Sequence, residues 1–148
     1  MPQSLARVLV HLVFSTKNRE PWIPSEVRGE LHAYLGGVLG TIGCPSIQVG
    51  GTEDHVHLLY SLSRTLSLAN VTEKVKTSTS RWMKPRAVAT FSWQTGYGAF
   101  SVGEAELRSV VRYIERQEAH HARWSFQDEM RDFFRRHQLP YDERYVWD

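Results

Sequence analysis

Two histidines separated by one residue, His55 and His57, are the residues in this sequence whose type and spacing best suit chemistry. They lie in the short run 54–60, which alternates in the way typical of a β-strand. Side chains two residues apart in a strand share a face and lie roughly 6.6 Å apart, so both imidazoles can bind one divalent metal ion. The alternative is that the pair lies on a solvated sheet face. His-x-His alone leaves both interpretations open.

The opposite face of the same strand is apolar. Val56, Leu58 and Tyr60 alternate with the histidines, so we expect them to pack into a core. A first strand over residues 7–15 shows the same alternation, with His11 on its second, mixed face. Its apolar face consists of Val8, Val10, Leu12 and Phe14. The two histidines therefore belong to the face that this core leaves open.

The predicted elements follow the order strand, helix, strand, strand, helix, strand. They cover residues 7–15, 25–39, 46–49, 54–60, 67–83 and 91–102. This is the split β-α-β order of ferredoxin-like domains, so we expect an α+β fold in which two helices cover one face of an antiparallel sheet. At 148 residues the chain is long enough to bury one core, and we expect a single domain over residues 1–148.

A third helix, over residues 104–121, carries the other candidate groups. Its apolar arc consists of Leu107, Val110, Val111 and Ile114. Tyr113 and Gln117 are four residues apart at the edge of this arc, so their side chains are neighbours. If the arc docks near the open face of the sheet, a tyrosine hydroxyl and an amide oxygen join the two imidazoles. The alternative is that Tyr113 packs with its hydroxyl in water and that Gln117 lies on the surface.

The net charge is small but unevenly distributed. A total of 18 Lys and Arg residues against 16 Asp and Glu residues gives a formal charge of +2, which indicates no global attraction to nucleic acid. Lys74, Lys76 and Arg81 nevertheless lie close together on the helix predicted over residues 67–83. Charge alone favours a solvated helix face, and an edge that contacts phosphates is the sharper alternative.

The sequence also argues against several partners and locations. The single cysteine, Cys44, cannot form an internal disulfide, which fits a cytoplasmic protein. The apolar run over residues 5–14 is too short to span a bilayer, so we expect no membrane partner. No glycine-rich motif typical of ATP or NAD binding is present, and we therefore expect no nucleotide cofactor.

Four stretches of the sequence resemble the HUH single-tyrosine transposases (TnpA type) of bacterial single-strand insertion sequences. They are residues 10–17, 54–59, 93–102 and 113–121, in the family's order and at its spacing. The His-Val-His run at 55–57 is a weak signal alone. It becomes specific together with Gly-Tyr-Gly at 96–98 and Tyr-x-x-x-Gln-x-x-His-His at 113–121. One position departs from the family, which often carries Asn where this chain has Arg116.

The resemblance implies a reaction and a set of roles. His55, His57 and Gln117 would hold a divalent metal ion, Mg²⁺ or Mn²⁺. Tyr113 would attack a phosphate of single-stranded DNA and leave a 5′-phosphotyrosine and a free 3′-hydroxyl, as in a metal-dependent endonuclease and strand transferase. The substrates would be DNA hairpins at element ends, and the protein would be a homodimer. Contacts to the DNA backbone would come from Lys17, Arg19, Lys74, Lys76 and Arg81.

Three other classes can be weighed against this one. A non-catalytic module that binds single-stranded nucleic acid on the same fold would expose stacking aromatics on the open sheet face, where this chain has histidines. A replication-initiator or relaxase-like nicking enzyme would share the metal site and the tyrosine, but such proteins usually carry them in a longer chain. A histidine-triad hydrolase would need a third histidine at position 59, which is Leu59.

Overall fold

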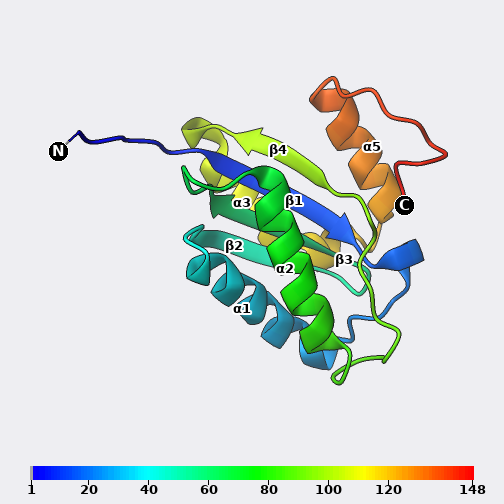
Figure 1. Ribbon diagram of the computed structural model, residues 1–148. Helices are drawn as coiled ribbons and strands as arrows, with labels where there is room; N and C mark the ends of the chain where they lie inside the picture. Colours follow the sequence, from blue (N-terminus) through cyan, green and yellow to red (C-terminus); the bar gives the residue numbers. More distant parts are fainter. Residues whose placement is uncertain (1) are drawn as a thin grey trace.

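Four antiparallel strands in the order β2-β3-β1-β4 form the central sheet of the computed structural model, which describes residues 2–148 (Figure 1). The strands are β1 (Leu9–Ser15), β2 (Ser46–Gly51), β3 (His55–Ser61) and β4 (Gly98–Val102). In the register of the two central strands, Val13 lies opposite His57 and Ser15 lies opposite His55. The α+β class predicted from the sequence is confirmed, and β3 lies between β1 and β2 as in a split β-α-β unit.

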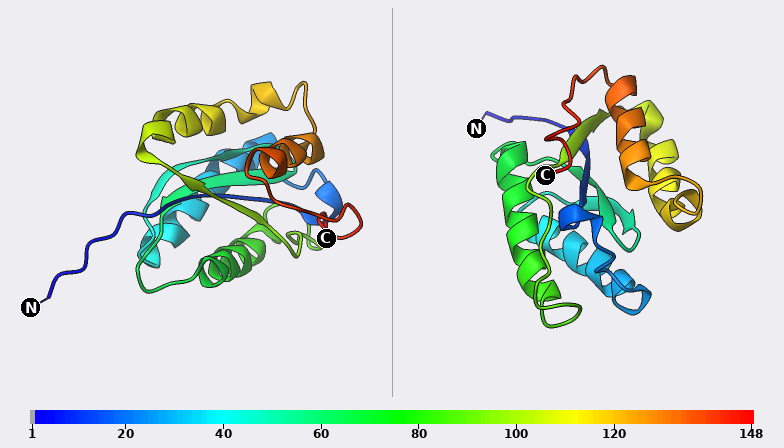
Figure 2. Two further views of the ribbon diagram at one scale, coloured as in Figure 1. Left: turned by 90° about the horizontal axis from the view of Figure 1, so that it is seen from above. Right: turned by 90° about the vertical axis from the view of Figure 1, so that its right-hand side faces the viewer.

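Two helices cover one face of this sheet (Figure 2). They are α1 (Ser25–Thr41) and α2 (Leu68–Met83). Apolar side chains at every second strand position pack against the apolar stripes of these helices. Leu12 of β1, Leu58 of β3 and Leu35 of α1 are fully buried in this core. Ser67 caps α2, because its hydroxyl accepts a hydrogen bond from the backbone amide of Asn70.

The ends of three strands differ from the prediction by two residues or more. The second strand ends at Gly51 instead of residue 49. The first strand begins two residues later than predicted, at Leu9, and Val8 before it is 48% exposed instead of packing in the core. The strand predicted over residues 91–102 is reduced to β4. Its first part makes only an isolated bridge between Trp93 and Thr16, because the chain there turns away from the sheet.

Three helices on the other side of the sheet come from the last third of the chain (Figure 2). They are α3 (Leu107–Glu115), α4 (Gln117–His120) and α5 (Phe126–Arg136). The prediction of one continuous helix over residues 104–121 is wrong. Residues Glu104–Glu106 form a 3₁₀ turn, η2, and the backbone at Arg116 leaves helical geometry with φ −99° and ψ 16°. No helix within residues 2–148 is long and apolar enough to cross a membrane.

Helix α5 packs on the histidine-bearing face through a second apolar cluster. Phe133 of α5 stacks on Phe100 of β4, with ring centroids 4.9 Å apart, and Val13 of β1 belongs to the same cluster. Burial of these side chains removes apolar surface from water, which stabilises the position of α5 over the sheet. Polar groups of α5 that face the sheet are thereby held close to β1 and β3.

Glycines allow α3 and α5 to approach the sheet closely. A β-carbon at Gly50 of β2 would lie 2.6 Å from the carbonyl oxygen of Ile114 and 2.8 Å from its Cγ2 atom. A β-carbon at Gly98 of β4 would lie 2.6 Å from the Cε atom of Met130. Real atoms do not approach so closely. At Gly50 the clash involves the backbone of Ile114, so a side chain there would force α3 away from the sheet, whereas at Gly98 the end of the flexible Met130 side chain would have to move. The absence of a side chain at Gly50 therefore sets the distance of α3 from the sheet.

Candidate active site

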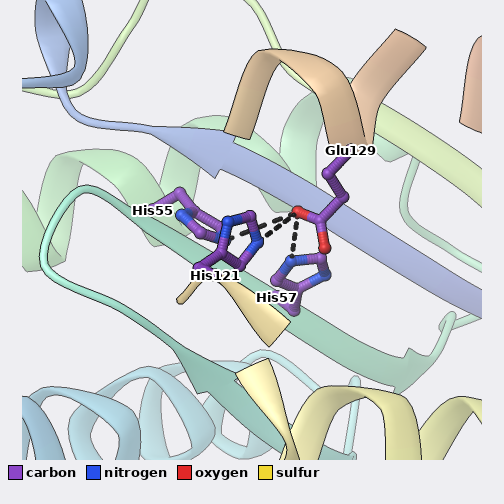
Figure 3. A group of neighbouring side chains, drawn as sticks. All are labelled: His55, His57, His121 and Glu129. Atoms are coloured by element: carbon purple, nitrogen blue, oxygen red, sulfur yellow. Dashed lines mark hydrogen bonds and ion pairs between the residues drawn. The ribbon is translucent and has the colours of Figure 1, made fainter. Parts of the chain in front are cut away.

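Three imidazoles and one carboxylate converge on the face between the sheet and α5 (Figure 3). His55 and His57 come from β3, His121 follows α4, and Glu129 comes from α5. One potential ligand atom from each of the four residues lies within 4.8 Å of those of the other three. His55 and His57 are fully buried, and Glu129 is 1% exposed. A carboxylate without solvent needs positive charge nearby, and this group of imidazoles surrounds it.

Each of the three imidazoles has a partner for its Nδ1 atom outside this group. The partners are Asp54 Oδ1 for His55 at 2.7 Å, His11 Nε2 for His57 at 2.8 Å and the Trp124 carbonyl oxygen for His121 at 2.6 Å. A carboxylate and a carbonyl only accept hydrogen bonds, so the Nδ1 atoms of His55 and His121 carry protons. The Nε2 atoms are then the ones that can bind a metal, in the arrangement common for histidine ligands.

The Nε2 atoms of all three histidines face one oxygen of Glu129. Oε1 of Glu129 lies 3.1 Å from Nε2 of His57, 3.1 Å from Nε2 of His121 and 3.5 Å from Nε2 of His55. Within residues 2–148, Nε2 of His121 is buried without a hydrogen bond of acceptable geometry. Imidazole nitrogens with a carboxylate oxygen are a suitable donor set for a divalent metal. The donor set and the unsatisfied nitrogen therefore fit a metal ion.

The predicted ligand Gln117 belongs to the same group. Its Oε1 atom lies 2.9 Å from Nε2 of His55, and its Nε2 atom donates a hydrogen bond to Oε2 of Glu129 at 3.0 Å. The side chain is 1% exposed. Asp54 accepts the hydrogen bond from Nδ1 of His55, so the proton of a neutral His55 is on Nδ1. Nε2 of His55 and Oε1 of Gln117 are then two acceptors that face each other, unless His55 carries a second proton. A cation beside these two atoms would satisfy both.

The hydroxyl of Tyr113 donates a hydrogen bond to the other oxygen of Glu129, Oε2. Burial raises the pKa of Tyr113, and the negative charge of Glu129 raises it further, so the side chain is a neutral phenol. Burial by itself would raise the pKa of Glu129 as well. The neighbouring imidazoles of His57 and His121 outweigh that effect and hold the pKa of Glu129 well below its ordinary value. The carboxylate thus links the phenol to the imidazoles: Oε2 contacts the phenol, and Oε1 faces the three imidazoles.

The predicted DNA contacts lie in two places. Lys17 and Arg19 belong to the short 3₁₀ turn η1 (Lys17–Arg19), which follows β1 at the end of the sheet where His55 begins β3. Lys74, Lys76 and Arg81 lie on α2, and this helix is on the opposite side of the sheet from α3, which carries Tyr113 (Figure 2). The amine of Lys76 donates to the carbonyl oxygens of residues 94, 95 and 96 at 2.7, 3.2 and 2.6 Å. The structure does not bring the α2 residues to the imidazole group.

Two central residues, His121 and Glu129, were absent from the ligands expected from the sequence. His121 closes the Tyr-x-x-x-Gln-x-x-His-His run, but on a helix continued from Tyr113 it would lie about 80° around the axis from that tyrosine, further than Gln117. Glu129 lies within the apolar face of α5, between Phe126 and Phe133. A single acidic residue in an otherwise apolar helical face is a signal for a buried charge, and it could have identified Glu129.

Comparisons with known proteins identify the family of the chain. The family model described as "Transposase IS200 like" matches residues 4–117, so the chain belongs to the IS200-like transposase family. Membership of this family makes the protein a DNA-cleaving enzyme that acts in DNA recombination. The match ends at Gln117, before His121 and Glu129. None of the curated proteins compared with the chain matches it.

Two solved structures share the fold. The crystal structure of a candidate transposase from Deinococcus radiodurans R1 is 22% identical with a TM-score of 0.62, over 79% of this chain and 98% of that chain. The structure of a REP-associated tyrosine transposase bound to a REP hairpin is 12% identical with a TM-score of 0.61, over 82% of this chain and 73% of that chain. At such identities the similarity establishes the fold alone.

Proposed function

We propose that this transposase cleaves and rejoins single-stranded DNA at hairpin-marked element ends, with Tyr113 as the nucleophile. The supporting observation is that the Tyr113 hydroxyl and the Nε2 atoms of His55 and His57 share Glu129 as a common neighbour. A structural neighbour is described as bound to a REP hairpin, which supports a hairpin as the kind of substrate. Because Tyr113 reaches this group within one chain, a homodimer is not needed to assemble the site. The homodimer expected from the sequence stays a prediction, which sedimentation analysis can test.

The reaction conserves the phosphodiester energy. The phenolic oxygen of Tyr113 forms a bond to phosphorus, and the bond between phosphorus and the 3′-oxygen breaks. The released 3′-oxygen takes up the proton that the phenol loses. Attack of a 3′-hydroxyl on the resulting 5′-phosphotyrosine reverses these changes and joins two strands. No nucleotide is consumed, in agreement with the lack of a nucleotide-binding motif in the sequence.

The side chains around Tyr113 have separate tasks. His55, His57 and Gln117, with His121 and Glu129 beside them, would hold Mg²⁺ or Mn²⁺, which supplies positive charge for the scissile phosphate. Oε2 of Glu129 accepts the phenolic hydrogen bond, so an acceptor for the proton of the nucleophile is already in contact with it. Burial of the group excludes water, which would compete with the phenol for the phosphate.

Trapping the covalent intermediate tests this function directly. The purified protein is incubated with pooled single-stranded hairpin oligonucleotides and Mg²⁺ or Mn²⁺, and denaturing gels are followed by peptide mass analysis. We expect a DNA–peptide adduct on Tyr113. The variant Tyr113→Phe should bind DNA without forming it, and His55→Ala with His57→Ala should lose the metal-dependent cleavage. The matched control Tyr34→Phe alters a tyrosine of α1 on the other side of the sheet. An adduct that persists in Tyr113→Phe would contradict the assignment.

A further inference from the structure

Three exposed arginines follow one another at four-residue intervals along α3: Arg108 and Arg112 lie within the helix, and Arg116 is the residue directly after its last turn. At a rise of about 1.5 Å per residue, neighbouring arginines lie about 6 Å apart along the helix axis. Their guanidinium groups form no hydrogen bond or ion pair with any residue in the part of the chain that the structure describes. We call these three residues the arginine face of α3.

The arginines of the neighbouring helix α5, in contrast, form ion pairs. Arg131 pairs with Asp128 and Glu143, while Arg135 and Arg136 both pair with Asp132. Asp128 and Asp132 of α5, with Glu143 from the chain after it, thus neutralise the cations of this helix, as in an ordinary solvated helix face. The arginine face of α3 lacks such partners, although it lies on the same side of the sheet. Its charge is therefore available to an anionic partner.

A groove of about 250 Å³ runs between α3 and α5. The buried His11 forms part of its floor, and Phe133 and Arg136 line it from α5. The remaining lining comes from η2 and α3: Glu106, Ser109, Val110 and Tyr113. His11 also contacts the Nδ1 atom of His57 at 2.8 Å. The groove therefore leads from the surface to the nucleophile and to the back of one imidazole of the candidate metal site.

The arginine face and the groove are placed to act on the same molecule. Tyr113 lies directly after Arg112, and the backbone amide of Arg116 donates to the carbonyl oxygens of both residues at 3.1 and 3.3 Å, so all three belong to the last turn of the helix. Guanidinium groups form strong, bidentate hydrogen bonds with phosphate oxygens. A phosphate chain held by the arginine face would therefore be fixed relative to the tyrosine hydroxyl by the rigidity of one helix.

We infer that the arginine face of α3 binds the sugar–phosphate backbone of the single-stranded DNA that enters the groove beside Tyr113. This inference rests on the proposed function and adds the path of the strand. It differs from the contacts expected from the sequence on α2, which lies on the opposite side of the sheet (Figure 2). Backbone contacts of this kind position the strand and carry no sequence information. Sequence or hairpin recognition would come from other parts of the surface.

The salt dependence of binding tests the inference without requiring cleavage. The probe is a fluorescein-labelled oligothymidine, whose anisotropy is measured with the full chain in EDTA over a range of salt concentrations. Each phosphate contact contributes about 0.7 to the slope of log affinity against log salt for single strands. We expect the triple variant Arg108→Gln, Arg112→Gln, Arg116→Gln to reduce the slope by about 2 and to weaken binding at low salt roughly tenfold or more. Its melting temperature should stay unchanged, because the three side chains are exposed.

A control variant removes the same charge from other exposed positions. It carries Arg64→Gln, Arg86→Gln and Arg144→Gln, which are exposed and lie outside α3 and α5, and we expect it to change the slope much less. The inference is overturned if the α3 variant keeps the wild-type slope. It is also overturned if a Lys74→Gln, Arg81→Gln variant of α2 reduces the slope more than the α3 variant does. These outcomes leave the Tyr113 adduct intact, so they are distinguishable from failure of the proposed function. If the wild type forms no adduct but the α3 variant has a reduced slope, the DNA contact of the arginine face is supported and the proposed cleavage by Tyr113 is contradicted.

Discussion

The Nε2 atom of His11 lies 2.8 Å from the Nδ1 atom of His57, and both rings are buried. Burial lowers the pKa of His11 well below its ordinary value, and the charge that His57 can carry lowers it further. His11 is therefore neutral at pH 7 and can accept a hydrogen bond at Nε2. When a metal ion binds Nε2 of His57, the proton of that ring lies on Nδ1, and His11 supplies its acceptor.

Replacing His11 should therefore weaken metal binding without removing a ligand. We expect His11→Phe to reduce the affinity for Mn²⁺ roughly tenfold or more, because the proton of His57 loses its acceptor. His11→Gln keeps an acceptor oxygen near the same place and should retain most of the affinity. Isothermal titration with Mn²⁺ measures both variants, and thermal melting without metal checks that they fold. Equal affinity in His11→Phe and the wild type would show that His11 does not orient His57.

Glu129 should contribute both to metal binding and to the reactivity of Tyr113. In Glu129→Gln the buried negative charge is lost, so we expect Mn²⁺ affinity to fall roughly tenfold or more and the DNA–tyrosine adduct to form more slowly. The matched control is Asp128→Asn, which alters the exposed acidic residue next to it and should leave both quantities near the wild-type values. Mn²⁺ binding that is as tight in Glu129→Gln as in the wild type would exclude the carboxylate from the ligands.

A single methyl group at Gly50 should displace Ile114 of α3 and with it the neighbouring nucleophile, Tyr113. In Gly50→Ala the new β-carbon overlaps the backbone and side chain of Ile114, so we expect a destabilisation of about 1–3 kcal/mol and a slower adduct on Tyr113. The control Gly37→Ala places its methyl group in open space on the exposed side of α1. It should stabilise the protein by about 0.5–1 kcal/mol, because alanine suits a helix better than glycine. Urea unfolding and adduct kinetics separate the two effects.

Acid should destabilise the protein partly through His32 of α1. Burial lowers its pKa from 6.5 to about 4, and the charge of Arg28 acts in the same direction. The unfolded chain therefore binds a proton between pH 6.5 and pH 4 that the folded chain does not, so stability falls as the pH drops through this window. We expect a contribution on the order of 2 kcal/mol. His32→Gln should lose correspondingly less stability between pH 7 and pH 4, measured by urea unfolding at both values. An identical loss in both proteins would rule this contribution out.

Local sequence patterns predict the part of the site that lies on β3. Strand alternation suffices to place His55 and His57 on one face and Leu58 on the other, because a period of two leaves only two choices. The prediction that both helices cover the Leu58 face also depends only on that alternation. The structure agrees on both points, since Leu58 is buried in the core between sheet, α1 and α2.

The remainder of the site depends on chain geometry that side-chain periodicity does not encode. No proline or glycine marks the break at Arg116: the apolar arc ends at Ile114, and the following residues up to His121 are polar except for Ala119. The break re-aims the chain, so that His121 faces β3. Glu129 then arrives from α5, and its direction depends on the turn between the two helices and on the packing of Phe133 against Phe100. Such long-range placements require the folded structure.

The position of His121 and Glu129 beyond Gln117 has a consequence for gene copies that decay. A copy interrupted after residue 117 would still match the family model over the same range, yet it would encode neither His121 nor Glu129. It would also lose α5 and the cover over the histidine-bearing face. Recognisable ancestry and an intact donor set are therefore separate properties of this gene. An inventory of working copies should count those that retain α5.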